Sequence, residues 1–175
     1  MKRLATALIA LAFIAAGCGS STSPSSTSTS PSGSPTKPTF TAALLPSNEV
    51  PPITNAESSG TGTATITFDT TTSGGNVTAA TVTFVANLTG FPAGTTVTLG
   101  HIHKAPAGVA GGVVISANVT ATPLATGTGT LTLSNASADP AVVQDILNNP
   151  SQYYFNLHST LNPGGFVRGQ LSRVQ

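Results

Sequence analysis

Three histidines are the main candidates for chemistry in this 175-residue chain: His101 and His103 stand two residues apart, and His158 is the third. On a β-strand, residues i and i+2 point to the same face about 6 to 7 Å apart, so the first two imidazoles can approach one ion. Neutral imidazole is a common ligand of copper and zinc, and three nitrogen ligands leave one position open. The sequence therefore predicts a copper or zinc site at these histidines, with Asn156 and Arg168 as groups that orient the ligands.

The same histidines also have a purely structural interpretation. His101 and His103 could hydrogen-bond backbone groups of the loop 106–112, and His158 could anchor the turn at 162–165. Buried polar groups are nearly always hydrogen-bonded, so polar side chains at strand ends are expected to find such partners. The sequence leaves both interpretations open.

Charged residues are rare in this chain, at 6% of its length. This composition excludes a basic surface for nucleic acid, so we expect no nucleic-acid partner. The chain contains no Gly-x-Ser-x-Gly elbow, phosphate-binding loop or HExxH helix, and we predict no enzymatic activity and no catalytic residues. Glu49 and Arg168 are among the few charges of the domain, and we expect them to form a structural ion pair.

The elements that must position these residues are β-strands. From Phe40 onward, runs of alternating apolar and Thr or Ser residues are separated by Gly, Pro and Asn clusters. This pattern predicts an all-β Greek-key sandwich of about eight strands. The predicted strands are residues 40–45, 62–69, 77–88, 95–103, 113–119, 128–133, 153–158 and 166–174.

Two local features modify this strand pattern. Asp139 and Pro140 can begin a short helix that Asn148-Asn149-Pro150 ends, and we expect it to cover one end of the sandwich. Val97 has the same parity as the histidines, whereas Ile102 should be buried. We therefore predict a bulge at Gly100 that reverses the alternation, so that all three histidines face outward at strand ends.

The amino terminus has the composition of an export signal. Two basic residues precede an apolar run at 4–16, and small residues follow up to Cys18, the one cysteine of the chain. The segment resembles a bacterial lipoprotein signal peptide over residues 1–17, which implies lipidation of Cys18. Residues 18–39 are rich in Ser, Thr and Pro, which predicts a disordered tether. We therefore expect a membrane partner through the lipid anchor, and an extracytoplasmic location on the outer membrane or cell surface.

Four separated motifs resemble the CHRD domain, which is named from chordin and is widespread in bacterial exported proteins. They lie at Asn48–Pro52, His101–Gly112, Tyr154–His158 and Asn162–Leu171. The resemblance covers about residues 40 to 174 and implies an immunoglobulin-like β-sandwich; we expect a CHRD-like domain over residues 40–175. Within the motifs we assign structural roles to Asn48, Glu49, Asn156 and Arg168. The chain departs from the family pattern at Lys104, where Gly is usual, and at Phe166, where Glu is usual.

The histidine pair, the later histidine and the Gly-rich loop ending in Arg are also similar to copper/zinc superoxide dismutases, which are Greek-key sandwiches. That family needs further histidines and an Asp, and this chain has only three histidines, so we expect no dismutase activity. The sequence thus predicts an envelope-anchored lipoprotein with a non-enzymatic binding, surface or matrix role and an unidentified protein or matrix partner. The alternative is a metal-binding protein that uses His101, His103 and His158.

Overall fold

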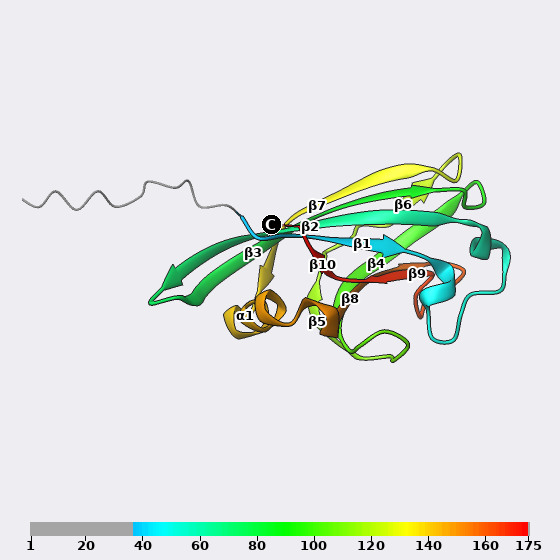
Figure 1. The fold of residues 1–175 in the computed structure, drawn as a ribbon. Coiled ribbons are helices and arrows are strands. Elements are labelled where there is room, and N and C mark those ends of the chain that lie inside the picture. The colour runs from blue at the N-terminus through cyan, green and yellow to red at the C-terminus, as the bar shows by residue number, and fades with distance from the viewer. Residues whose placement is uncertain (1–36, 175) are drawn as a thin grey trace, which may run out of the picture. The chain divides into compact units, whose positions relative to one another are not determined.

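The computed structural model describes residues 37–174, which form a sandwich of two antiparallel β-sheets (Figure 1). The first sheet has the strand order β10-β1-β2-β3-β7, and the second has the order β5-β4-β8-β9, with β6 paired to β4. The strands are β1 (Thr39–Leu44), β2 (Thr61–Ser73), β3 (Asn76–Thr89), β4 (Thr95–Lys104), β5 (Gly112–Ser116), β6 (Thr122–Leu124), β7 (Gly129–Ala138), β8 (Tyr153–Ser159), β9 (Val167–Gln170) and β10 (Ser172–Arg173). The predicted all-β sandwich is confirmed.

The core lies between the inner faces of the two sheets. In β2 and β3 the apolar residues of one parity are buried, among them Ile66, Phe68 and Phe84. Phe84 stacks on Phe155 of β8 with ring centroids 5.0 Å apart, so this pair joins the two inner faces. Burial of these large side chains, each worth about 1.5 to 3 kcal/mol, is the main contribution that stabilises a chain without a disulfide.

The helix and the short turns cover the ends of the sandwich. Helix α1 (Pro140–Asn148) begins as predicted, because the Asp139 side chain accepts hydrogen bonds from the backbone N–H groups of Ala141 and Val142. Its buried Val143 and Ile146 belong to the core. Three 3-10 turns complete the described elements: η1 (Pro46–Asn48), η2 (Ala56–Ser59) and η3 (Pro150–Gln152).

The strand count and the carboxy-terminal strand differ from the predictions. Strand β6 was not predicted because Thr122-Pro123-Leu124 is too short to show alternation. The strand predicted at 166–174 is two strands, and β9 and β10 lie in different sheets. Gly169 brings β9 close to β1, because a Cβ atom at this position would lie 2.2 Å from the carbonyl oxygen of Ala43.

The reversal of alternation predicted for the histidine strand is present, two residues earlier than expected. Val97 of β4 pairs with Ser159, and Leu99 pairs with the next residue of β8, His158, so Thr98 is the extra residue of a bulge. As a result Val97 and Ile102 are both buried although their parities differ, and Leu99 is exposed. The bulge thereby places the histidines on the face opposite the core.

The predicted signal peptide, Cys18 and most of the predicted tether lie outside the described residues. Strand β1 begins at Thr39, one residue before the predicted start of the domain. Within residues 37–174, no helix has the length and apolar character needed to cross a membrane.

Candidate metal centre

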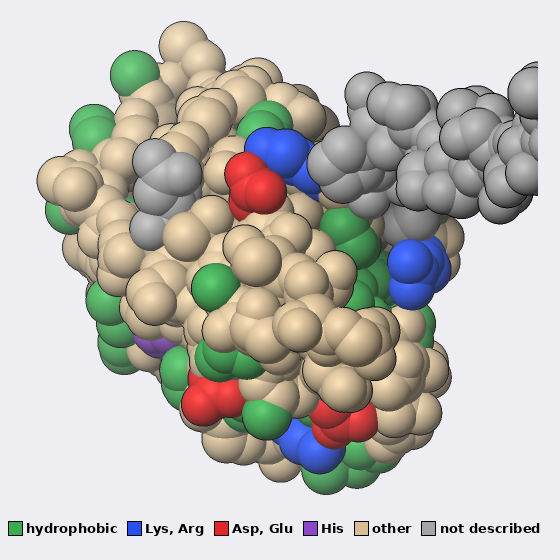
Figure 2. Space-filling view, turned by 90° about the vertical axis from the view of Figure 1, so that its left-hand side faces the viewer, with side chains coloured by type: hydrophobic (Ala, Val, Ile, Leu, Met, Phe, Trp, Pro, Cys, Tyr) green, Lys and Arg blue, Asp and Glu red, His purple; other side chains and the backbone are tan. Residues whose placement is uncertain are grey.

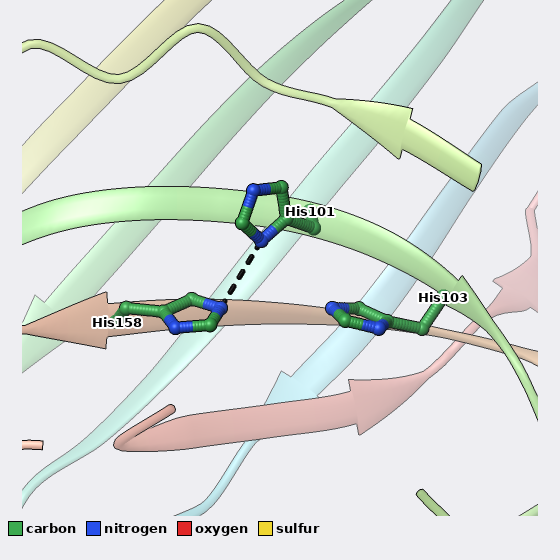
Figure 3. A group of neighbouring side chains, drawn as sticks. All are labelled: His101, His103 and His158. Atoms are coloured by element: carbon green, nitrogen blue, oxygen red, sulfur yellow. Dashed lines mark hydrogen bonds between the residues drawn. The ribbon is translucent and has the colours of Figure 1, made fainter. Parts of the chain in front are cut away.

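Three imidazoles meet on the outer face of the second sheet (Figure 3). His101 and His103 come from β4 and His158 from the neighbouring β8. One nitrogen atom of each ring lies within 4.8 Å of the other two, and His101 Nδ1 is 3.1 Å from His158 Nε2. The structure thus brings together the three residues that the sequence singled out.

The prediction that all three histidines face solvent is wrong in one respect. They lie on the non-core face, but His103 and His158 are both only 8% exposed, and only His101 is partly exposed. Every residue of β8 is buried. The core buries the inner face of this strand, and loops cover its outer face. Accordingly, Figure 2 shows only a small histidine surface, bordered by hydrophobic side chains.

Two of the histidines donate hydrogen bonds to backbone carbonyl groups. His103 Nδ1 is 2.9 Å from the carbonyl oxygen of Gly111, and His158 Nδ1 is 2.7 Å from that of Pro163. A carbonyl oxygen can only accept, so each Nδ1 carries the proton. The structural interpretation is therefore correct for these two side chains, whereas His101 contacts His158 instead of loop backbone.

These hydrogen bonds are compatible with metal binding. Histidines that ligate a metal usually donate their second ring N–H to a carbonyl or carboxylate, which fixes the tautomer and the ring orientation. With the Nδ1 proton held by a carbonyl, Nε2 of His158 is left with a lone pair, and it points at His101 (Figure 3). The donor set of three imidazole nitrogens therefore fits copper or zinc.

The electrostatics of the cluster favour neutral rings. Burial is the largest of the causes that lower the pKa of His101 to about 4, and the neighbouring His158 and His103 contribute the rest. Burial also lowers the pKa of His103, although its hydrogen bonds to Gly111 and Asn156 act in the opposite direction. Both shifts favour neutral rings at pH 7. A neutral His103 with its proton on Nδ1 has a lone pair at Nε2, and this lone pair faces the Asn156 side chain at 3.0 Å.

A buried glutamate that the sequence analysis missed fixes one of the loops. Glu57 is 2% exposed, and its Oε2 accepts hydrogen bonds from Ser159 Oγ at 2.6 Å and Asn162 Nδ2 at 2.5 Å. These bonds fix the turn whose Pro163 carbonyl holds His158. The residues around Glu57 are small and polar, as in an exposed loop, and contain no signal of this role.

Arg168 acts on the histidines through an aromatic ring. It is 2% exposed, and its side chain donates hydrogen bonds to the carbonyl oxygens of Asn48 and Val109. Its guanidinium lies 4.3 Å from the ring centre of Tyr154, and that ring stacks on His103 at 4.8 Å. Asn48 in turn donates its amide to the Arg168 carbonyl, so the two residues bind each other between η1 and β9.

The predicted ion pair between Glu49 and Arg168 is wrong. The ion pairs found within residues 37–174 are Lys37–Asp69 and Lys104–Asp145. The Arg168 guanidinium binds backbone carbonyl groups instead of the Glu49 carboxyl group. Glu49 Oε1 and Arg168 Nη2 are both buried and lack a hydrogen-bond partner.

Comparison with known proteins identifies the family. The CHRD domain profile matches residues 40–171, which is most of the chain and includes every residue of the histidine cluster. The chain belongs to the CHRD domain family. This family is not a known family of enzymes. No curated protein and no solved structure matches the chain.

Proposed function

We propose that this CHRD-domain protein is a non-enzymatic lipoprotein of the cell envelope whose folded domain binds a copper or zinc ion. The observation that carries the metal proposal is the convergence of three imidazole nitrogens within 4.8 Å, on rings of which two are held by backbone carbonyls. His101, His103 and His158 would hold the ion. When bound, it would be a Lewis acid with an open coordination position.

The surroundings of the cluster favour an exchangeable ion over a closed structural site. His101 is partly exposed. The exposed Leu99 pairs with His158 and the exposed Val113 pairs with His103, so apolar side chains flank the histidines. A structural zinc site usually has four protein ligands and is closed to solvent. A three-ligand site at a partly open surface is suited to uptake and release of the ion.

The cellular location is proposed from the sequence. The basic start, the apolar run at 4–16 and the small residues before Cys18 support export and lipidation. A Ser, Thr and Pro-rich tether of this length would hold the domain roughly 25 Å from the lipid. An ion-binding domain at this position would sample the extracytoplasmic metal pool.

Isothermal titration of the tag-free mature chain, purified in detergent, tests the metal site. We expect Zn²⁺ or Cu²⁺ to bind with a Kd below about 100 μM, and His101→Ala to weaken binding by about tenfold or more, as loss of a ligand requires. Thr65→Ala, on the exposed outer face of the first sheet, is the control and should bind normally. Absence of binding below about 100 μM, or equal binding by His101→Ala, would show that the cluster is structural. The intact mass of the same preparation reports whether Cys18 carries lipid.

A further inference from the structure

A cavity of about 640 Å³ lies between the η1 turn, the loop at 107–108 and strand β9. Two charged side chains that are almost fully buried, Glu49 at 7% exposed and Arg168 at 2%, are among the residues that line it. Val50 and Pro52 contribute apolar wall. This volume is in the range of cavities that hold small organic molecules, and such cavities typically combine apolar walls with a few buried polar groups.

Both charged side chains keep one polar atom without a hydrogen bond. Glu49 Oε1 and Arg168 Nη2 are buried and have no hydrogen-bond partner among residues 37–174. The other guanidinium nitrogens of Arg168 donate to the carbonyl groups of Asn48 and Val109, which fixes the plane of the guanidinium and the direction of Nη2. Since buried polar groups are nearly always hydrogen-bonded, these two atoms indicate a ligand.

The charge of Arg168 indicates that this ligand is an anion. The guanidinium is charged at every pH, and here it is bound by uncharged groups, namely two backbone carbonyls and the ring of Tyr154 at 4.3 Å. Glu49 forms no ion pair with it, and burial raises the pKa of Glu49 to about 7, so this carboxyl group is only partly ionised at neutral pH. Buried charges are normally paired with an opposite charge.

We propose that this cavity binds the carboxylate group of an organic ligand that has an apolar body: Arg168 Nη2 donates to one carboxylate oxygen, and protonated Glu49 donates to the other. A carboxylate suits this pair of donors because it offers two acceptor oxygens and one negative charge. A neutral hydroxyl group would leave the charge of Arg168 without compensation. Val50 and Pro52 would contact the apolar body. A free organic acid and the carboxyl terminus of a peptide share this chemistry.

The proton on Glu49 makes the binding dependent on pH. An ionised Glu49 repels a carboxylate and has no proton to donate, so the affinity falls as the pH rises through the Glu49 pKa of about 7. The charge that acts on this pKa is that of Arg168, which lowers it. The titratable groups on the elements around Glu49 are Arg168 of β9, His103 of β4, Tyr154 and His158 of β8, and Glu57 of η2.

Isothermal titration of the mature chain in detergent, with EDTA present so that no metal ion holds the carboxylate, tests the site. At about pH 6 we expect benzoate to bind with a Kd below about 1 mM, and benzamide, which has the same shape without the charge, to bind about tenfold more weakly or less. N-acetyl-trialanine with a free carboxyl terminus and its carboxyamide form a second pair. Tighter binding of the peptide acid than of benzoate would assign a chain end as the ligand, and the reverse order a free organic acid. If neither acid binds, or if acids and amides bind equally, the proposal is wrong.

Two variants test whether these residues form the site. Glutamine donates an N–H group at every pH, so between about pH 6 and pH 8 the wild type should lose about tenfold in benzoate affinity and Glu49→Gln less than about twofold. Ala107→Leu fills the cavity from an exposed loop and should abolish binding, whereas Ala141→Leu, exposed on α1, is the matched control and should bind as wild type. The same pH dependence in wild type and Glu49→Gln, or unchanged binding by Ala107→Leu, would overturn the assignment.

Discussion

The outer faces of the two sheets have the same pleat and opposite environments. On the first sheet the outer side chains are mostly threonines that stay in solvent, such as Thr63 and Thr65 of β2. On the second sheet several of the corresponding side chains are buried, among them His103, His158 and Arg168. Polar residues at alternate positions therefore do not by themselves distinguish a wetted surface from a site. The difference is whether a loop covers them.

The covering loops explain why the second face carries histidine, asparagine and arginine. A loop that packs on a sheet buries backbone carbonyl groups that need donors. Here the donors are side chains of the sheet: His103 binds the carbonyl of Gly111, His158 that of Pro163, and Arg168 that of Val109. The hydrogen bonds that hold the loops on the sheet therefore also orient the imidazole rings. The covering loops and the candidate site share one hydrogen-bond network.

The largest effect that this comparison predicts is the loss of Arg168. Arg168→Ala would leave the carbonyl groups of Asn48 and Val109 without their donor and would remove the ring contact with Tyr154. We expect a loss of about 3 to 5 kcal/mol in the free energy of unfolding, measured by urea denaturation. An ion pair with Glu49 plays no part in this expectation, since the two side chains do not form one.

Arg173→Ala is the matched control for this variant. Arg173 is exposed on β10 and donates to the carbonyl of Leu147 at the surface, so its loss should cost about 1 kcal/mol or less. If Arg168→Ala does not fold, Arg168→Lys should fold with reduced stability, because lysine keeps the charge without the planar fork. Equal stability of the Arg168 and Arg173 alanine variants would show that the loops do not depend on this guanidinium.

A smaller, pH-dependent effect is expected from Glu49. Its pKa in the folded chain is raised from 4.5 to about 7 by burial, so the folded state favours the protonated form. This contribution to stability is fully present below pH 4.5 and is lost as the pH rises to about 7. Between these limits, wild type should lose roughly 1 to 3 kcal/mol relative to Glu49→Gln, measured by thermal and urea unfolding.

The stability of wild type must be compared with that of Glu49→Gln at each pH, because the contribution of His101 to stability has the opposite pH dependence. Its pKa is lowered from 6.5 to about 4, so its contribution is complete above pH 6.5 and is lost as the pH falls towards 4. Asp69→Asn, on the exposed face, provides a control for removal of a carboxylate. A stability difference between wild type and Glu49→Gln that stays constant with pH would mean that Glu49 is not desolvated in the fold.

The sequence was sufficient to predict the β-sandwich and the three histidines of the candidate site. It was not sufficient to predict the contacts around these histidines. Alternation in β2 and β3 predicted the buried face, and the need to bury both Val97 and Ile102 predicted a bulge. These are local constraints that neighbouring residues impose. The contacts of Glu49 and Glu57 depend on loops meeting strands about a hundred residues away in the sequence, and no local pattern encodes them. For the same reason the guanidinium of Arg168 was assigned to the wrong partner.

The smallest effect is expected on the exposed face of the first sheet. Thr65 lies between Thr41 and Val85 of the neighbouring strands. Its side chain is exposed, so no loop of residues 37–174 covers it. Thr65→Val keeps the β-branched shape that suits a strand, so the free energy of unfolding should change by less than about 0.5 kcal/mol and zinc affinity should not change. Urea denaturation and zinc titration measure both. A loss above about 1 kcal/mol would mean that the Thr65 hydroxyl group has a bound partner. The outer face of the first sheet would then be covered as well, and the two faces would differ only in the groups that cover them.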